Sequence, residues 1–222
     1  MSFNPLGKFD PHAALNEAAK AAAISLLAKL PDCPHGSLDR IYNHWTVGHY
    51  NTDFPEYNIG VANDNGRFHL DISGDPRDNA IGVNNHDPHS HTYRRNTGAL
   101  GVSTDDMVGA GTHDFGPEPV TLTTIEFLCA ANAALAKKYS IDVNGRTTRA
   151  PYAGEHTILT HAEAGDLVGS PPQYPPYGPK STFERWDLLS FVPIPEGVSF
   201  TDATVTGDAI RARSRAYKLA LG

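Results

Sequence analysis

The sequence is poor in cysteine, with only Cys33 and Cys129 among its 222 residues. Two thiols cannot form the several disulfides that staple small secreted domains. The fold must therefore rest on an apolar core, and it would tolerate a reducing compartment. We interpret both residues as ordinary core or near-surface thiols.

Long apolar runs are also lacking. No segment reaches the ~20 apolar residues that span a bilayer. The alanine-rich stretch 13–30 is interrupted by Asn16, Glu17, Lys20 and Lys29, so it lacks the continuous apolar region of a secretory signal. These absences predict a chain that is made in the cytoplasm and does not insert stably into a membrane.

Positive charge is scarce, because 18 Lys and Arg residues face 25 Asp and Glu residues and give a formal net charge of -7. A general positive field that holds nucleic acid is therefore not expected. The hydrophobic content of 40% is typical of a globular protein. We expect a helical extension over residues 1–37, a main domain over 38–192, and a tail over 193–222 whose short helix packs on the same domain.

Helix signals occur near both ends of the chain. The first helix is predicted to start at Asp10, which can cap it, with Pro11 in its first turn, and to end before Pro31. The last is predicted over 208–221. We interpret its Arg and Lys side chains as a solvated face, the alternative being a surface that attracts anionic polymers.

Between these helices the sequence predicts short strands and one further helix. The central helix is expected over 123–139, where Thr123 and Glu126 match a capping box. The pair Asn65-Gly66 is a strong hairpin signal. Strands are expected at 41–44, 57–62, 67–70, 99–103 and 158–159, with a long polar loop over 74–96.

Two histidines and one aspartate have the residue types of metal ligands. His44 ends an apolar strand, where its scaffold can fix it, and we prefer it to the nearby His49. His161 ends another short apolar segment, and Asp187 follows later in the chain. Catalytic zinc sites bind the ion through three such ligands and leave a fourth position open. The three residues therefore predict a metal-dependent hydrolase.

Four blocks of sequence, in order, resemble one known family. The first two are His44-Trp45-Thr46, and Tyr57-Asn58-Ile59-Gly60-Val61 followed by Asp64-Asn65-Gly66. The third is His91, then Asn96 and Leu100-Gly101-Val102, and the fourth joins His161 to Asp187. Together they cover residues 38–192 and resemble the zinc-dependent N-acetylmuramoyl-L-alanine amidases of type 2, which include phage lysozyme amidases and peptidoglycan recognition proteins.

The resemblance implies an α/β fold with a mixed central β-sheet flanked by helices, and extra helices at both ends. It implies a Zn²⁺ ion held by His44, His161 and Asp187. It also implies that Tyr57 lines the zinc pocket and is needed for hydrolysis. Two further residues, His91 and Asn96, match family positions that face the substrate.

Some positions depart from the family pattern. Recycling amidases carry a Glu where this chain has Ser103, which shifts the expected catalytic partner to Tyr57, as in phage-type members. The family often has Lys where this chain has Arg185, and we expect this guanidinium to be a fixed positive group for the developing oxyanion. Leu188 and Leu189 replace the usual Pro-Gly after the last ligand.

The resemblance implies a peptidoglycan amidase that cuts between N-acetylmuramic acid and L-alanine. We expect a monomer that is made in the cytoplasm and released to the cell wall, as a phage endolysin is. A cytosolic recycling amidase, a non-catalytic peptidoglycan-binding module and an injected toxin are alternatives. Glu155 and Glu163 lie near the second histidine in the sequence, and we interpret them either as a base or ligand partner, or as solvated surface groups.

Overall fold

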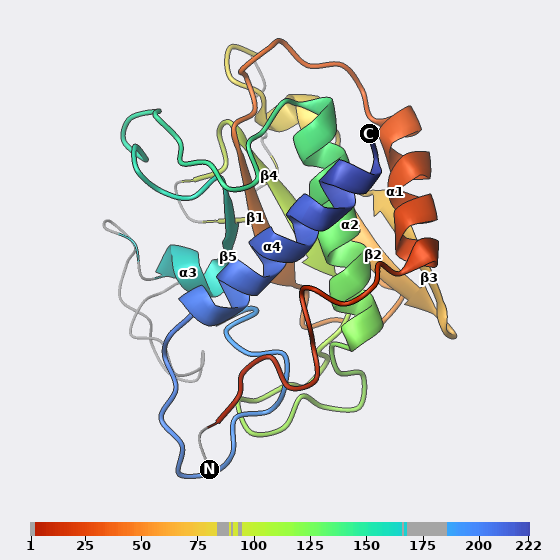
Figure 1. Cartoon of the computed structure of the whole chain (residues 1–222), viewed down its shortest axis with the longest axis vertical. Helices are drawn as coiled ribbons and strands as arrows, with labels where there is room; N and C mark the ends of the chain where they lie inside the picture. The colour runs from red at the N-terminus through yellow and green to blue at the C-terminus, as the bar shows by residue number, and fades with distance from the viewer. Residues whose placement is uncertain (1–2, 84–88, 90, 93–94, 166, 168–185) are drawn as a thin grey trace.

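The computed structural model describes residues 3–83, 89, 91–92, 95–165, 167 and 186–222, which form a five-stranded β-sheet with helices against it (Figure 1). The strands are β1 (Arg40–Trp45), β2 (Ile59–Asp64), β3 (Arg67–Ile72), β4 (Ala99–Thr104) and β5 (Ile158–Thr160). The helices are α1 (Glu17–Lys29), α2 (Leu122–Lys138), α3 (His161–Gly165) and α4 (Thr204–Ala220), with the 3-10 helix η1 (Pro76–Asn79). The predicted α/β class, with a mixed sheet flanked by helices, is confirmed.

The strands are ordered β3-β2-β4-β1-β5 across the sheet. Strand β1 runs parallel to both β4 and β5, and β2 runs parallel to β4. Only β3, at one edge, pairs antiparallel with its neighbour β2 among the described strands. Parallel neighbours end at the same edge of a sheet, which is where open α/β sheets place their ligand sites.

The predicted hairpin between β2 and β3 is confirmed. Its two turn residues are Asn65, with φ of 51°, and Gly66, with φ of 88°. Positive φ at both central positions is what a two-residue type I′ turn requires, and this turn follows the twist of the strands that it joins.

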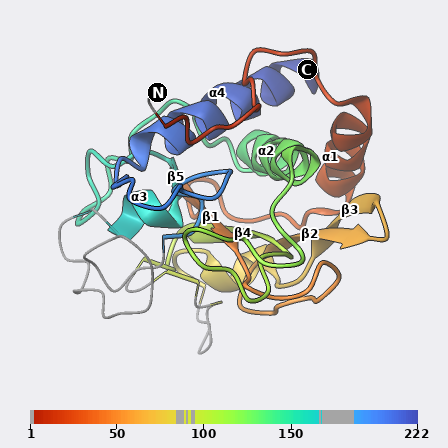
Figure 2. The same ribbon diagram turned by 90° about the horizontal axis from the view of Figure 1, so that it is seen from below.

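The two faces of the sheet have different partners. Ile41, Leu100 and Val102 point into the main apolar core, whereas Tyr42 and Ala99 belong to a smaller buried cluster on the other face. Figure 2 shows α1, α2 and α4 together on one side of the sheet. In the described part of the chain, α3 and η1 lie on the second face, which carries the alternate residues of β1 and β4.

The first helix begins later than the sequence predicts. Asp10 does not cap it; the cap is Asn16, whose side chain accepts a hydrogen bond from the third residue after it. The carbonyls of Ala13 and Ala14 instead accept hydrogen bonds from the Arg213 guanidinium, at 2.6 and 2.7 Å. This contact with α4 takes up carbonyl groups that a longer helix would have used. The predicted end of the helix, at Leu30, is confirmed.

The central helix, α2, has a different cap from the predicted one. Thr121 and Thr124 form the capping box, in place of Thr123 and Glu126. The Glu126 carboxylate is bound by the Arg213 guanidinium, with both distances at 2.8 Å. Helix ends can shift by a residue or two when another residue offers an equivalent cap.

The C-terminal helix, α4, starts at Thr204, four residues before the predicted start at 208. Its basic residues do not form the solvated face that the sequence predicts. Arg211 and Arg213 are buried in ion pairs with Glu163 and Glu126, while Arg215 is exposed. These ion pairs take up two of the four basic side chains that the alternative, a surface for anionic polymers, would need.

Both terminal helices pack against α2 and share its apolar core. The division at residues 37 and 192 stays a prediction. In the part of the chain described, no helix combines the length and the apolar character that crossing a membrane requires.

Candidate metal centre

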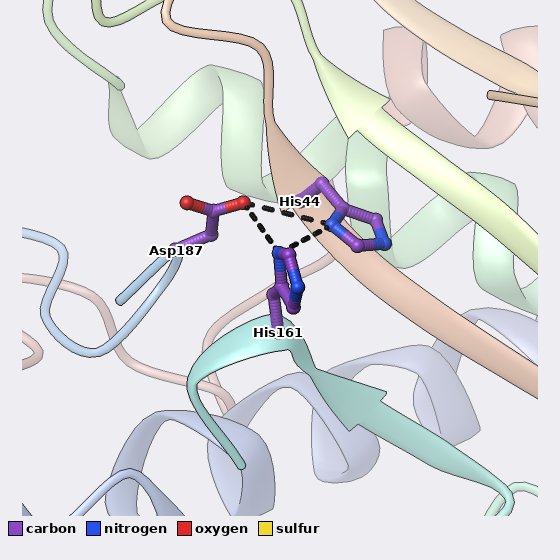
Figure 3. A group of neighbouring side chains, drawn as sticks. All are labelled: His44, His161 and Asp187. Atoms are coloured by element: carbon purple, nitrogen blue, oxygen red, sulfur yellow. Dashed lines mark hydrogen bonds and ion pairs between the residues drawn. The ribbon is translucent and has the colours of Figure 1, made fainter. Parts of the chain in front are cut away.

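The three predicted ligands come together at the carboxyl end of the sheet (Figure 3). His44 is in β1, and His161 directly follows β5 as the first residue of α3. Because β1 and β5 are parallel neighbours, their ends bring the two histidines together across 117 residues of sequence. Asp187, from the segment before α4, completes the group. The first two could be placed from strand ends alone, whereas the third depends on how a later segment folds back.

The ligand atoms form a small triangle. The Nδ1 atoms of His44 and His161 lie 3.0 Å apart, and the Asp187 Oδ2 atom lies 2.9 Å from the second and 3.5 Å from the first. Donors bonded to a tetrahedral zinc ion at its usual bond lengths lie about 3.3 Å from one another. The observed separations span that value, so the three atoms can share one ion with little movement.

The surroundings also fit a bound cation. All three side chains are buried, and the Asp187 Oδ1 atom has no hydrogen-bond partner among the described residues. Burial by itself would raise the pKa of Asp187, but the adjacent His161 and His44 lower it to about 2. A buried carboxylate that stays ionised needs a positive partner, and a metal ion is a stronger one than an imidazole. This group could therefore bind a metal ion, and zinc is one of the ions that fit.

A hydroxyl group and a third imidazole lie behind the first ligand. The Thr92 Oγ1 atom lies 3.4 Å from the Nε2 atom of His44 and 3.0 Å from the Nδ1 atom of His91. Burial, followed by the charge of His44, lowers the pKa of His91 well below its usual range, so this ring is neutral near pH 7. The sequence offered no signal for Thr92 beyond its place after a histidine. Thr92 becomes relevant only because the fold brings its hydroxyl group next to His44.

Asn96, which we expected to face the substrate, has a clear contact of another kind. Its Oδ1 atom accepts hydrogen bonds from the backbone N–H groups of His91, at 3.2 Å, and of Thr92, at 2.8 Å. The amide therefore shapes the turn that presents these two side chains to His44. A substrate contact for Asn96 or for His91 stays a prediction.

The expected catalytic tyrosine lies beside the centre. The Tyr57 ring is 5.0 Å from the His44 ring, measured between centroids, and its side chain is partly exposed. The Tyr57 ring therefore lies against the ring of one candidate ligand, and its part in catalysis stays a prediction. The other expected catalytic residue, Arg185, lies outside the described residues.

Neither acidic candidate from the sequence is free to act as a base. Both carboxylate oxygens of Glu155 accept hydrogen bonds from the Arg95 guanidinium, at 2.8 and 2.9 Å. Glu163 binds the Arg211 guanidinium, at 2.8 and 3.0 Å, and accepts a hydrogen bond from the Thr160 N–H group. The second pair fixes the start of α3, where the candidate ligand His161 lies. The interpretation as solvated surface groups is also wrong for both.

No match to this chain was found among protein-family models, curated proteins or solved structures. The amidase family therefore stays a resemblance, carried by four blocks of residues.

Proposed function

We propose that this chain is a zinc-dependent N-acetylmuramoyl-L-alanine amidase that cleaves peptidoglycan, with the role of a phage endolysin. One observation carries the proposal: His44, His161 and Asp187 bring two nitrogens and one oxygen within 3.5 Å of one another in a buried site. The two imidazoles with one carboxylate form a donor set that catalytic zinc sites use. The type 2 amidase fold is part of the same proposal, supported by the mixed sheet.

Each residue of the centre has a proposed role in the hydrolysis of an amide. A bound zinc ion would polarise the scissile carbonyl and lower the pKa of a water molecule toward neutrality. His44, His161 and Asp187 hold the ion, and the Glu163–Arg211 pair keeps the second histidine in place. The buried surroundings exclude bulk water and so strengthen the electrostatic interactions at the centre.

The residues around the ligands would complete the reaction. The Tyr57 hydroxyl donates a hydrogen bond to the oxygen on which negative charge develops, and Arg185 adds a fixed positive charge near it. His91 is neutral, so its ring can donate a hydrogen bond to the muramyl or peptide part of the substrate. Asn96 would assist by holding the loop that carries His91.

Metal analysis tests the ligand set. The purified protein is expected to contain about one zinc ion per chain, since the residues that the structure describes offer one set of three candidate ligands. His44→Ala and His161→Ala should each lose the ion, whereas His35→Ala, at an exposed position, should keep it. A metal content that is unchanged in both ligand variants would refute the proposed centre.

The reaction is tested on purified sacculi. The expected products are new L-alanine amino termini without new reducing sugar ends. The His161→Ala variant should not produce these amino termini. Reducing ends would indicate a glycosidase. Activity on soluble muropeptides but not on sacculi would indicate a recycling amidase, and binding to sacculi without any cleavage would indicate a binding module.

A further inference from the structure

The chain makes a tight turn at the candidate ligand Asp187. The Leu189 N–H group donates a hydrogen bond to the Trp186 carbonyl oxygen, at 2.9 Å, and Leu188 has φ of 61°. This left-handed backbone is rare for residues other than glycine. Proline cannot adopt it, because its ring fixes φ at about -65°. The Pro-Gly that the resembled family usually carries at this point could not follow the same path, so this chain must hold Asp187 in another way.

A side chain of α4 holds the turn. The Thr206 hydroxyl donates a hydrogen bond to the Leu188 carbonyl oxygen, at 2.5 Å, and both residues are 0% exposed. The same hydroxyl lies 3.1 Å from the Ala203 carbonyl oxygen, which already accepts a hydrogen bond from the Gly207 N–H group at 3.2 Å. A hydroxyl has one hydrogen, so we assign it to the shorter contact, with Leu188. A left-handed residue persists only where its surroundings fix it, and Thr206 supplies such a contact.

The segments that carry the second and third candidate ligands are joined directly. The Ala162 N–H group donates a hydrogen bond to the Asp187 carbonyl oxygen, at 3.1 Å, and Ala162 directly follows His161. The side chains of the two candidate ligands approach to 2.9 Å, between Nδ1 of His161 and Oδ2 of Asp187. A shift of either segment would therefore change the separation of the ligand atoms.

The next residues of α4 contact the segment that carries His161. A Cβ atom at Gly207 would collide with the Glu163 carboxylate, and the φ of Gly207 is not positive, so this glycine serves close packing. Arg211, one turn later, binds the same carboxylate at 2.8 and 3.0 Å. Figure 1 shows the start of α4 beside α3. The first turns of this helix therefore contact both the His161 and the Asp187 segments.

We propose that Thr206, Gly207 and Arg211 form a clasp on α4 that positions two of the three metal ligands, with Thr206 as the positioning residue for Asp187. The clasp rests on the proposed function, since it requires the zinc ion. Without the Thr206 hydroxyl, the turn loses a contact that fixes it, and the Asp187 carboxylate no longer stays at one position. Residues behind the ligands of a metal site change its affinity by about ten-fold to a hundred-fold. Binding is reciprocal, so the bound ion should also hold the start of α4 in place.

The zinc affinity of the full chain, measured by competition with a chromogenic chelator, tests the clasp. Thr206→Val keeps the shape of threonine without its hydroxyl, and its Kd for zinc should rise about ten-fold to a hundred-fold. Thr206→Ser retains the hydroxyl and should keep most of the affinity. Circular dichroism establishes that each metal-free variant is folded at the assay temperature.

Thr157→Val is the matched control. The buried Thr157 hydroxyl also donates a hydrogen bond to a backbone carbonyl, that of Asp142, but it lies at the opposite end of β5 from His161. This variant should lose stability and keep the wild-type Kd for zinc. A wild-type Kd in Thr206→Val, or an equal rise in Thr157→Val, would overturn the positioning role. Absence of zinc binding in the wild type would refute the metal centre and the clasp together, whereas zinc binding without cleavage of sacculi would refute the amidase function alone.

The wild type decides the proposal if Thr206→Val does not fold. Zinc should slow amide hydrogen exchange more over residues 204–211 than over residues 214–220 of the same helix, because the clasp lies in the first part. Global stabilisation by zinc acts on both parts and so cancels in this comparison. Equal slowing along the helix would overturn the clasp.

Discussion

Replacing Arg211 with methionine should destabilise the protein strongly, because this arginine neutralises a buried carboxylate. Its guanidinium bonds both oxygens of Glu163, at 2.8 and 3.0 Å, and the Ile158 carbonyl oxygen, at 2.8 Å. Arg211 is 4% exposed and Glu163 is 6% exposed. Removing one member of a buried pair leaves the other charge without compensation, which costs about 3–5 kcal/mol. For a chain of this size the melting temperature should fall by about 6–20 °C.

The change is measured by urea and thermal unfolding, followed by circular dichroism. Arg215→Met is the matched control, since this arginine is exposed on the same helix and its loss should change the free energy of unfolding by at most about 0.5 kcal/mol. Combining Arg211→Met with Glu163→Leu should recover much of the loss, because no buried charge is then left alone. A loss below about 1 kcal/mol in Arg211→Met would refute the reasoning.

The pH dependence of this variant provides a second check. Burial already raises the pKa of Glu163 although Arg211 lowers it, so removing the arginine should raise that pKa further. The folded state would then bind a proton more tightly than the unfolded state, and the variant should lose stability as the pH rises. The difference between Arg211→Met and the wild type should therefore be smaller at pH 5 than at pH 7.

Two further predictions concern residues near the centre. Asn96→Ala should lower activity on sacculi without loss of zinc, because two backbone N–H groups lose their acceptor at about 1–3 kcal/mol each; wild-type activity would contradict this role. Burial raises the pKa of Asp106 to about 8 from an unfolded value of about 3.9, so metal-free protein should lose stability as the pH rises from 4 to 8. Asp106→Asn should reduce this slope in urea unfolding, and an unchanged slope would contradict it.

Local patterns in the sequence predicted much of the fold. Short apolar segments and the Asn65-Gly66 pair located the strands and the hairpin, because these features act within a few residues. Helix boundaries were less accurate where distant residues compete for backbone groups. The carbonyls of Ala13 and Ala14 are bound by Arg213 from the other end of the chain, and no local pattern contains this contact.

The sequence predicted the three clustered candidate ligands and the tyrosine beside them, but not most of the contacts that hold them. His44 and His161 end apolar segments, and Asp187 was proposed by its residue type and then supported by the resemblance to the family. The contacts around them depend on loops and on ion pairs between distant elements. Thr92 could not be placed on His44 from sequence, and Glu163 could not be assigned to Arg211, because both pairings arise from tertiary packing.

The Arg211 contact with β5 also bears on the solubility of the folded chain. Strand β5 is three residues long and forms one edge of the sheet, where unpaired backbone groups can template pairing with another molecule. The Ile158 carbonyl accepts a hydrogen bond from Arg211 of α4, so this helix occupies a backbone group that another strand could otherwise bind. A chain cut before Thr204 would expose the strand and the apolar surface under the helix. Self-association through this edge, rather than simple unfolding, is the failure that such a truncation should produce.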